Sequence, residues 1–119
     1  MKVIVEIPLL PIPEGNPNWR GYWAQKARAV KVAREMAYYC SLFCGKPLKN
    51  PVLDVDISIK DKRFIRDPDN WISSAKPFID GCVDAGIIAN DRELTIRSIT
   101  HGINKDVAPL TILNFSGEE

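Results

Sequence analysis

Aspartates gather in one short stretch of this sequence, residues 66–70, which reads Arg-Asp-Pro-Asp-Asn. Asp67 and Asp69 stand two residues apart there, and Asp91 follows a segment with helical periodicity. Carboxylate oxygens are the ligands that Mg²⁺ and Mn²⁺ prefer, and these ions keep waters that substrate phosphates replace. The three aspartates therefore predict a divalent-metal site, provided that strand pairing brings Asp91 back to the other two.

A lysine follows the first two aspartates on what should be the same helix. At about 100° per residue, Asp69, Lys76 and Asp80 fall within about 40° of one another on a helix over residues 69–85. Phosphodiester hydrolysis uses such a group, because a metal activates water and a nearby cation stabilises the developing oxyanion. The opposite arc is apolar and should face a core; it holds Ile72, Ala75, Phe78, Ile79, Cys82 and Val83.

The same residues also have a purely structural interpretation. Asp67 before Pro68 is a good helix opening, with an N-cap followed by proline at the first position. Asp69 in a first turn is favoured by the helix dipole. Lys76 and Asp80 have the spacing of an i,i+4 pair, worth a few tenths of a kcal/mol. Spacing alone leaves both interpretations open.

Composition points to one globular domain covering residues 1–119. Apolar residues make up 45% and charged residues 26%, which argues against disorder. No apolar run approaches the roughly 20 residues of a membrane span, and the opening Met-Lys-Val-Ile-Val-Glu resembles a strand more than a secretory signal. Cys40, Cys44 and Cys82 cannot all pair within one chain, so we expect reduced thiols and a cytoplasmic protein.

The net charge of +1 hides an uneven distribution. Residues 1–51 carry eight Lys/Arg and three acids, a balance of +5, whereas residues 52–119 carry eight and twelve, a balance of −4. This division fits a surface that contacts a polyanion beside a cation-binding pocket, although a solvated surface explains it equally well. The candidates for contacts with a DNA backbone are Arg20, Arg28, Lys31, Arg34, Lys62, Arg63 and Arg66.

Hydrophobic periodicity predicts strands at residues 2–8, 52–60, 94–103 and 110–115, and helices at 19–43 and 69–85. The order β-α-β-α-β-β indicates a small α+β domain with a mixed sheet and helices packed on it. We expect Asn16 or Asn18 to cap the first helix, Pro77 to kink or restart the second, and the last two strands to form a hairpin across Gly102 to Ala108. The first helix should bury Trp23, Ala29, Val30, Ala33, Met36, Ala37 and Cys40.

These motifs resemble the RusA family of Holliday junction resolvases. The family pattern is Asp-x-Asp-Asn, a helix with a lysine and then Asp-Ala or similar, an Ala-Gly stop and an acidic pair. Its elements stand here at 67–70, Lys76, 80–81, 85–86 and 90–91. The lysine follows the second aspartate by seven residues instead of the four of the best-known members, and the acidic pair is Asn-Asp.

The resemblance implies a homodimeric, Mg²⁺-dependent endonuclease, with Mn²⁺ as an alternative ion. Such enzymes resolve four-way DNA junctions by paired symmetric nicks in recombination and repair, often in phages and prophages. The implied metal ligands are Asp67, Asp69 and Asp91, and Lys76 is the implied catalytic lysine. The alternative is a catalytically inactive DNA-binding or dimerisation module of the same fold.

Overall fold

The computed structural model describes residues 2–13, 19–45, 47–89 and 91–118, with Asp91 described by its backbone alone. Two long helices and four strands follow one another in the predicted β-α-β-α-β-β order, and each lies within a few residues of its predicted range. The elements are β1 (Lys2–Ile7), α1 (Trp23–Ser41), β2 (Lys49–Ile59), the 3-10 helix η2 (Lys62–Phe64), α2 (Pro68–Asp84), the 3-10 helix η3 (Asp91–Glu93), β3 (Thr95–Ile103) and β4 (Leu110–Glu118).

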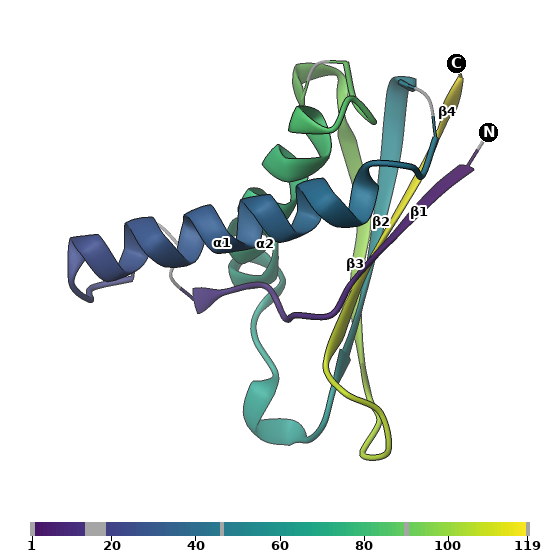
Figure 1. The fold of residues 1–119 in the computed structure, drawn as a ribbon. Coiled ribbons are helices and arrows are strands. Elements are labelled where there is room, and N and C mark those ends of the chain that lie inside the picture. Colours follow the sequence, from purple (N-terminus) through teal and green to yellow (C-terminus); the bar gives the residue numbers. More distant parts are fainter. Residues whose placement is uncertain (1, 14–18, 46, 90, 119) are drawn as a thin grey trace.

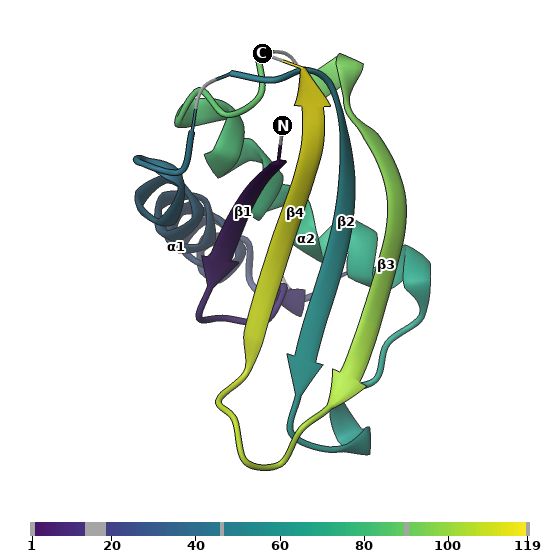
Figure 2. The same cartoon turned by 90° about the vertical axis from the view of Figure 1, so that its right-hand side faces the viewer.

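The four strands form one mixed sheet in the order β1-β4-β2-β3. β4 runs antiparallel to both β1 and β2, whereas β2 and β3 are parallel. Both helices cover one face of the sheet and the other face is open, as the two views show (Figures 1 and 2). The predicted α+β class with a mixed sheet and helices packed on it is therefore confirmed.

The predicted hairpin between the last two strands is wrong, because β2 lies between β3 and β4. The chain passes from β2 through α2 to β3, and a helix crossover of this kind joins parallel neighbours. Residues 104–109 then carry the chain past the end of β2. This link must cross two strand spacings of about 4.8 Å each. An extended chain covers about 3.3 Å per residue, so residues 104–109 are long enough.

Alternating side chains build the core between the sheet and the helices. The alternation predicted for β2 is confirmed, since its apolar side chains are buried and Asp54, Asp56 and Ser58 face the other way. Full burial of one such side chain stabilises the fold by about 1.5–3 kcal/mol. The largest fully buried side chains include Trp71 and Phe78 of α2, Phe115 and Leu113 of β4, and Leu53, Ile57 and Ile59 of β2.

The two helices pack closely against each other at Gly81. A Cβ atom there would lie 2.7 Å from the Cβ of Ala37 and would overlap the carbonyl oxygen of Arg34. A larger side chain at this position would therefore push α1 and α2 apart. Arg34 also donates two hydrogen bonds across the pair, from Nε to Asp84 Oδ2 at 2.5 Å and from Nη2 to Asp84 Oδ1 at 2.8 Å.

Several helix details differ from the predictions. The N-cap of α1 is Tyr22, so neither Asn16 nor Asn18 caps it, and both asparagines lie outside the described residues. Trp23, expected on the buried face, is 74% exposed because α1 points away from the sheet and begins at the end far from it (Figure 1). Pro77 lies inside α2, so the helix does not restart there, and the predicted kink stays a prediction.

In α2, Trp71 is buried in place of the predicted Ile72, which is 36% exposed. The indole has more apolar area to bury than the isoleucine side chain. Burial raises the pKa of the Cys82 thiol to about 12, so this group is not a nucleophile at neutral pH. No helix in the described ranges combines the length and the apolar character needed to cross a bilayer.

Candidate metal and nucleic-acid site

Asp67 occupies the N-cap of α2, as the structural interpretation predicted. Its backbone oxygen accepts a 3.0 Å hydrogen bond from the N–H of Trp71, and Pro68 follows at the first helical position. The carboxylate, however, makes no capping hydrogen bond in the described part of the chain, and it is exposed. Capping therefore explains the backbone of Asp67 but leaves its side chain available for another role.

Asp69 and Lys76 both lie on the exposed side of α2, Asp69 in the first turn and Lys76 about two turns later. The predicted i,i+4 pair is present, since Lys76 Nζ lies 3.2 Å from Asp80 Oδ1. Asp84, one turn after Asp80, pairs with Arg34 of α1. The helix thus carries two carboxylates at its start and a lysine further along one polar surface.

Asp91 begins η3, and η3 contacts α2. The side chain of Asp91 lies outside the described part of the structure. Among the side chains that are described, no group of three or more His, Cys, Asp or Glu is placed to hold a metal ion. The three-carboxylate site stays a prediction, and the structure describes the side chains of two of its three ligands, Asp67 and Asp69.

Arg66 fixes the segment that leads into Asp67. Its Nη1 donates a 2.7 Å hydrogen bond to the carbonyl oxygen of Pro11, and its guanidinium lies 4.7 Å from the centre of the Trp71 ring. A cation over an indole face is attracted by the ring quadrupole. Arg66 therefore ties the proline-rich segment after β1 to the start of α2, and these contacts compete with its predicted role in binding DNA.

His101 is a neighbour of the acidic motif that sequence reasoning missed. The imidazole centre lies 6.3 Å from the Trp71 ring in the first turn of α2, although the two residues are far apart in the sequence. No local pattern predicts this proximity, because it depends on β3 lying parallel to β2 beneath α2. His101 is exposed, and it belongs to the immediate surroundings of residues 67–71.

The predicted basic surface of α1 is present but is not uniform. Arg28 and Lys31 are exposed along the helix, and Arg20 is exposed just before it. Arg34 is also exposed, yet its hydrogen bonds hold the pKa of Asp84 below its ordinary value. A phosphate would have to compete with this carboxylate for Arg34, so Arg20, Arg28 and Lys31 are the stronger candidates for DNA contact.

β2 and β3 end side by side (Figure 2), and basic side chains gather around this end of the sheet. Arg63 pairs with Asp61, with Nη2 2.9 Å from Oδ2, and this hydrogen bonding lowers the pKa of Asp61. The β3–β4 connection adds Lys105, which lines an open pocket of about 380 Å³ together with Lys62. Sequence reasoning missed Lys105, and its proximity follows from parallel strands ending at the same edge.

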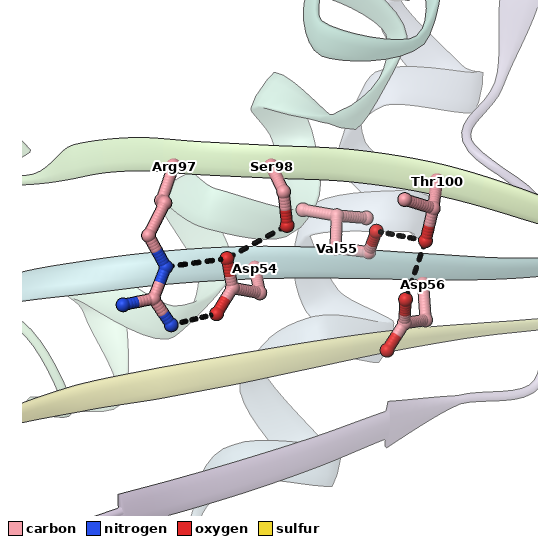
Figure 3. Close-up of polar contacts among 6 residues, drawn as sticks. All are labelled: Asp54, Val55, Asp56, Arg97, Ser98 and Thr100. Carbon is pink, nitrogen blue, oxygen red and sulfur yellow. Dashed lines mark hydrogen bonds and ion pairs between the residues drawn. The ribbon is translucent and has the colours of Figure 1, made fainter.

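The carboxylates of β2 do not belong to the candidate metal site. They accept hydrogen bonds from side chains of β3 on the open face of the sheet (Figure 3). Asp54 accepts hydrogen bonds from Arg97 Nε at 3.1 Å and from Ser98 Oγ at 2.7 Å. The register shifts between Leu53 and Asp54, and this irregularity lets two consecutive residues of β3 reach one carboxylate. Asp56 accepts from Thr100 Oγ1 at 2.5 Å.

Hydrogen bonds from Arg97 and then from Ser98 lower the pKa of Asp54. This carboxylate is therefore engaged in holding β2 to β3, and it is not a spare ligand. The contrast with Asp67 distinguishes the acids that stabilise the sheet from those left open at the start of α2.

Comparison with known proteins adds one relative. No family model matches this sequence. An uncharacterized protein of Xylella fastidiosa (strain Temecula1) is 35% identical to it over 102 residues. The match covers 81% of this chain and 63% of the relative, so the chain spans less than two thirds of the length of the curated protein that it matches.

Proposed function

We propose that this chain is a RusA-like, metal-dependent DNA endonuclease. As a homodimer, it would resolve four-way junctions by paired symmetric nicks during recombination and repair, in the cytoplasm of a bacterial or phage-infected cell. The observation that carries the proposal is the exposed carboxylate of Asp67, which stands at an N-cap without making the capping bond. Asp69 is exposed two residues later in the same first turn.

The donor set fits Mg²⁺, with Mn²⁺ as the alternative, because these hard ions take carboxylate oxygens. Asp67, Asp69 and Asp91 would hold the ion. When bound, it would supply an activated water and compensate charge on the leaving oxygen. A cation would offset the like charges of two exposed carboxylates that stand two residues apart.

The chain's own residues would do the remaining work. Lys76 would stabilise the charge on the scissile phosphate or orient the attacking water. Arg20, Arg28 and Lys31 would hold the DNA backbone on one side, while Lys62 and Arg63 would hold it near the end of the sheet. Arg66 would keep the segment before Asp67 in place through its contacts with Pro11 and Trp71. A two-fold dimer would supply two equivalent sites for two symmetric nicks.

The test incubates the protein with a four-way junction and with linear duplexes of the same sequences, in Mg²⁺ or in chelator. We expect paired nicks near the branch point only with the junction and only with Mg²⁺. If no branched substrate is nicked in a metal-dependent way, the proposed endonuclease activity is refuted. Tight junction binding without cleavage would instead identify an inactive DNA-binding module of the same fold.

A further inference from the structure

Two aromatic rings stand in solvent at the N-terminal end of α1. Tyr22 is 64% exposed and Trp23 is 74% exposed. Their ring centres lie 5.8 Å apart and their planes are tilted by 52°. This end of the helix projects away from the sheet, as Figure 1 shows. Large rings grouped in solvent are a common mark of an interaction surface.

The core of this chain cannot cover these rings. The first buried residue of α1 is Ala33, ten residues after Trp23, or about 15 Å along the helix axis. The backbone beneath the rings is also ordered by local contacts. Tyr22 O accepts a 3.1 Å hydrogen bond from Lys26 N, and Gly21 lies so close to the Trp19 ring that a Cβ there would overlap it. The two rings therefore extend into solvent from a backbone that these contacts hold.

The charge around the rings selects the partner. Residues 19–31 contain four Lys/Arg and no acid, namely Arg20, Lys26, Arg28 and Lys31. A second copy docked ring to ring would bring like charges together, which costs free energy. A polyanion is the complementary partner, and a nucleic acid is the polyanion that also offers flat faces for aromatic rings.

We propose that Tyr22 and Trp23 form a stacking platform for an unpaired DNA base, while the neighbouring cations hold the flanking phosphates. The inference deepens the proposed function, since unpaired or distorted bases occur at branch points. It also makes a claim independent of cleavage. A platform of this kind binds single strands with little sequence preference, because every base has a π face.

The test measures the affinity of a fluorescent oligo-dT strand and of a duplex of equal length, in chelator and by anisotropy. Trp23→Ala should weaken single-strand binding by about 5-fold or more, the lower end of what losing one base stack costs. Trp23→Phe should keep most of the affinity. Phe43→Ala is the matched control, because Phe43 is 97% exposed just beyond the other end of α1 and should not matter.

Wild-type affinity in Trp23→Ala would overturn the proposal. So would conversion of a dimer to a monomer with unchanged DNA affinity, seen by sedimentation, because the rings would then contact a second copy. The outcomes separate this inference from the proposed function. If the protein binds oligo-dT through Trp23 but cuts no junction, the stacking platform stands and the proposed enzyme activity is refuted. If Trp23→Ala cuts junctions as well as the wild type and binds oligo-dT with unchanged affinity, the proposed enzyme stands and the stacking platform is refuted.

Discussion

The ammonium of Lys76 lies 3.2 Å from Oδ1 of Asp80, one turn further along α2. The lysine side chain is 51% exposed, and a pair of this kind is worth only a few tenths of a kcal/mol. A scissile phosphate would therefore compete easily for the ammonium. Lys76 therefore forms an ion pair with Asp80, and this pair does not exclude the proposed catalytic role.

Lys76→Ala should slow single-turnover junction cleavage by about 100-fold, as loss of one charge-stabilising donor does. Junction affinity in a gel shift should change little, because one phosphate contact among many is lost. Asp80→Asn is the matched control and should cleave at nearly the wild-type rate. If Lys76→Ala cleaves as fast as wild type, the lysine serves only as the surface partner of Asp80.

Asp69→Asn should abolish cleavage and keep the fold. It should also remove the rise in melting temperature that Mg²⁺ gives the wild type, because a ligand stabilises only the state that binds it. Asp106→Asn makes the same chemical change in an exposed loop and should keep both properties. An active Asp69→Asn protein would contradict the metal assignment. A fall of several degrees in metal-free melting temperature would favour a purely structural Asp69.

Lys31 and Arg34 of α1 should differ in their effect on DNA binding. Lys31→Ala should lower the slope of log affinity against log salt by about 0.9, the value of one phosphate contact. Arg34→Ala should lower it less, since Asp84 already engages this guanidinium. Lys49→Ala, which removes an exposed lysine outside α1, serves as the control. An unchanged slope in Lys31→Ala would place the DNA elsewhere.

Gly81→Ala should destabilise the protein by about 1–3 kcal/mol, the usual cost of inserting a methyl group into a packed contact. The added Cβ would meet Ala37 and the backbone of Arg34. Gly102→Ala is the matched control, because a Cβ there has nothing within 4 Å. Urea unfolding monitored by circular dichroism measures both variants. Equal stabilities would show that the helices separate without cost.

The contact between Arg97 and Asp54 should make stability depend on pH in the acid range. The folded pKa of Asp54 is lowered, so its contribution is complete above the unfolded pKa of about 3.9. That contribution is lost as the pH falls through the folded pKa. The melting temperature of Arg97→Gln should therefore lie below wild type at about pH 6 and approach it in strong acid. A difference that is constant with pH would assign the effect to packing.

Local patterns in the sequence predicted the features that depend on neighbours along the chain. Alternation gave the buried face of β2, helix-opening preferences gave Asp67 as the N-cap, and i,i+4 spacing gave the contact between Lys76 and Asp80. Each of these rests on backbone geometry within one element. Periodicity is a sufficient guide there, because tertiary packing reinforces what the segment already favours.

Features that join distant elements escaped the same reasoning. The hairpin rule failed because it considers only consecutive strands, whereas the crossover through α2 places β2 between β3 and β4. His101 and Lys105 reach their neighbours through this same parallel pairing. Trp23 was assigned to the core because helical spacing does not reveal how far a helix extends away from the sheet. The candidate site was thus predictable in its α2 residues and not in its surroundings.

The position of β4 has a consequence for how the chain folds as it is synthesised. β4 pairs with both β1 and β2, and in the described sheet it is the only strand that β1 contacts through hydrogen bonds. An emerging chain therefore holds its first strand unpaired until residues 110–118 appear. Long-range pairing of this kind slows folding and leaves an apolar edge exposed meanwhile. We expect a chain cut at residue 108 to need a chaperone or to aggregate, where the longer chain folds.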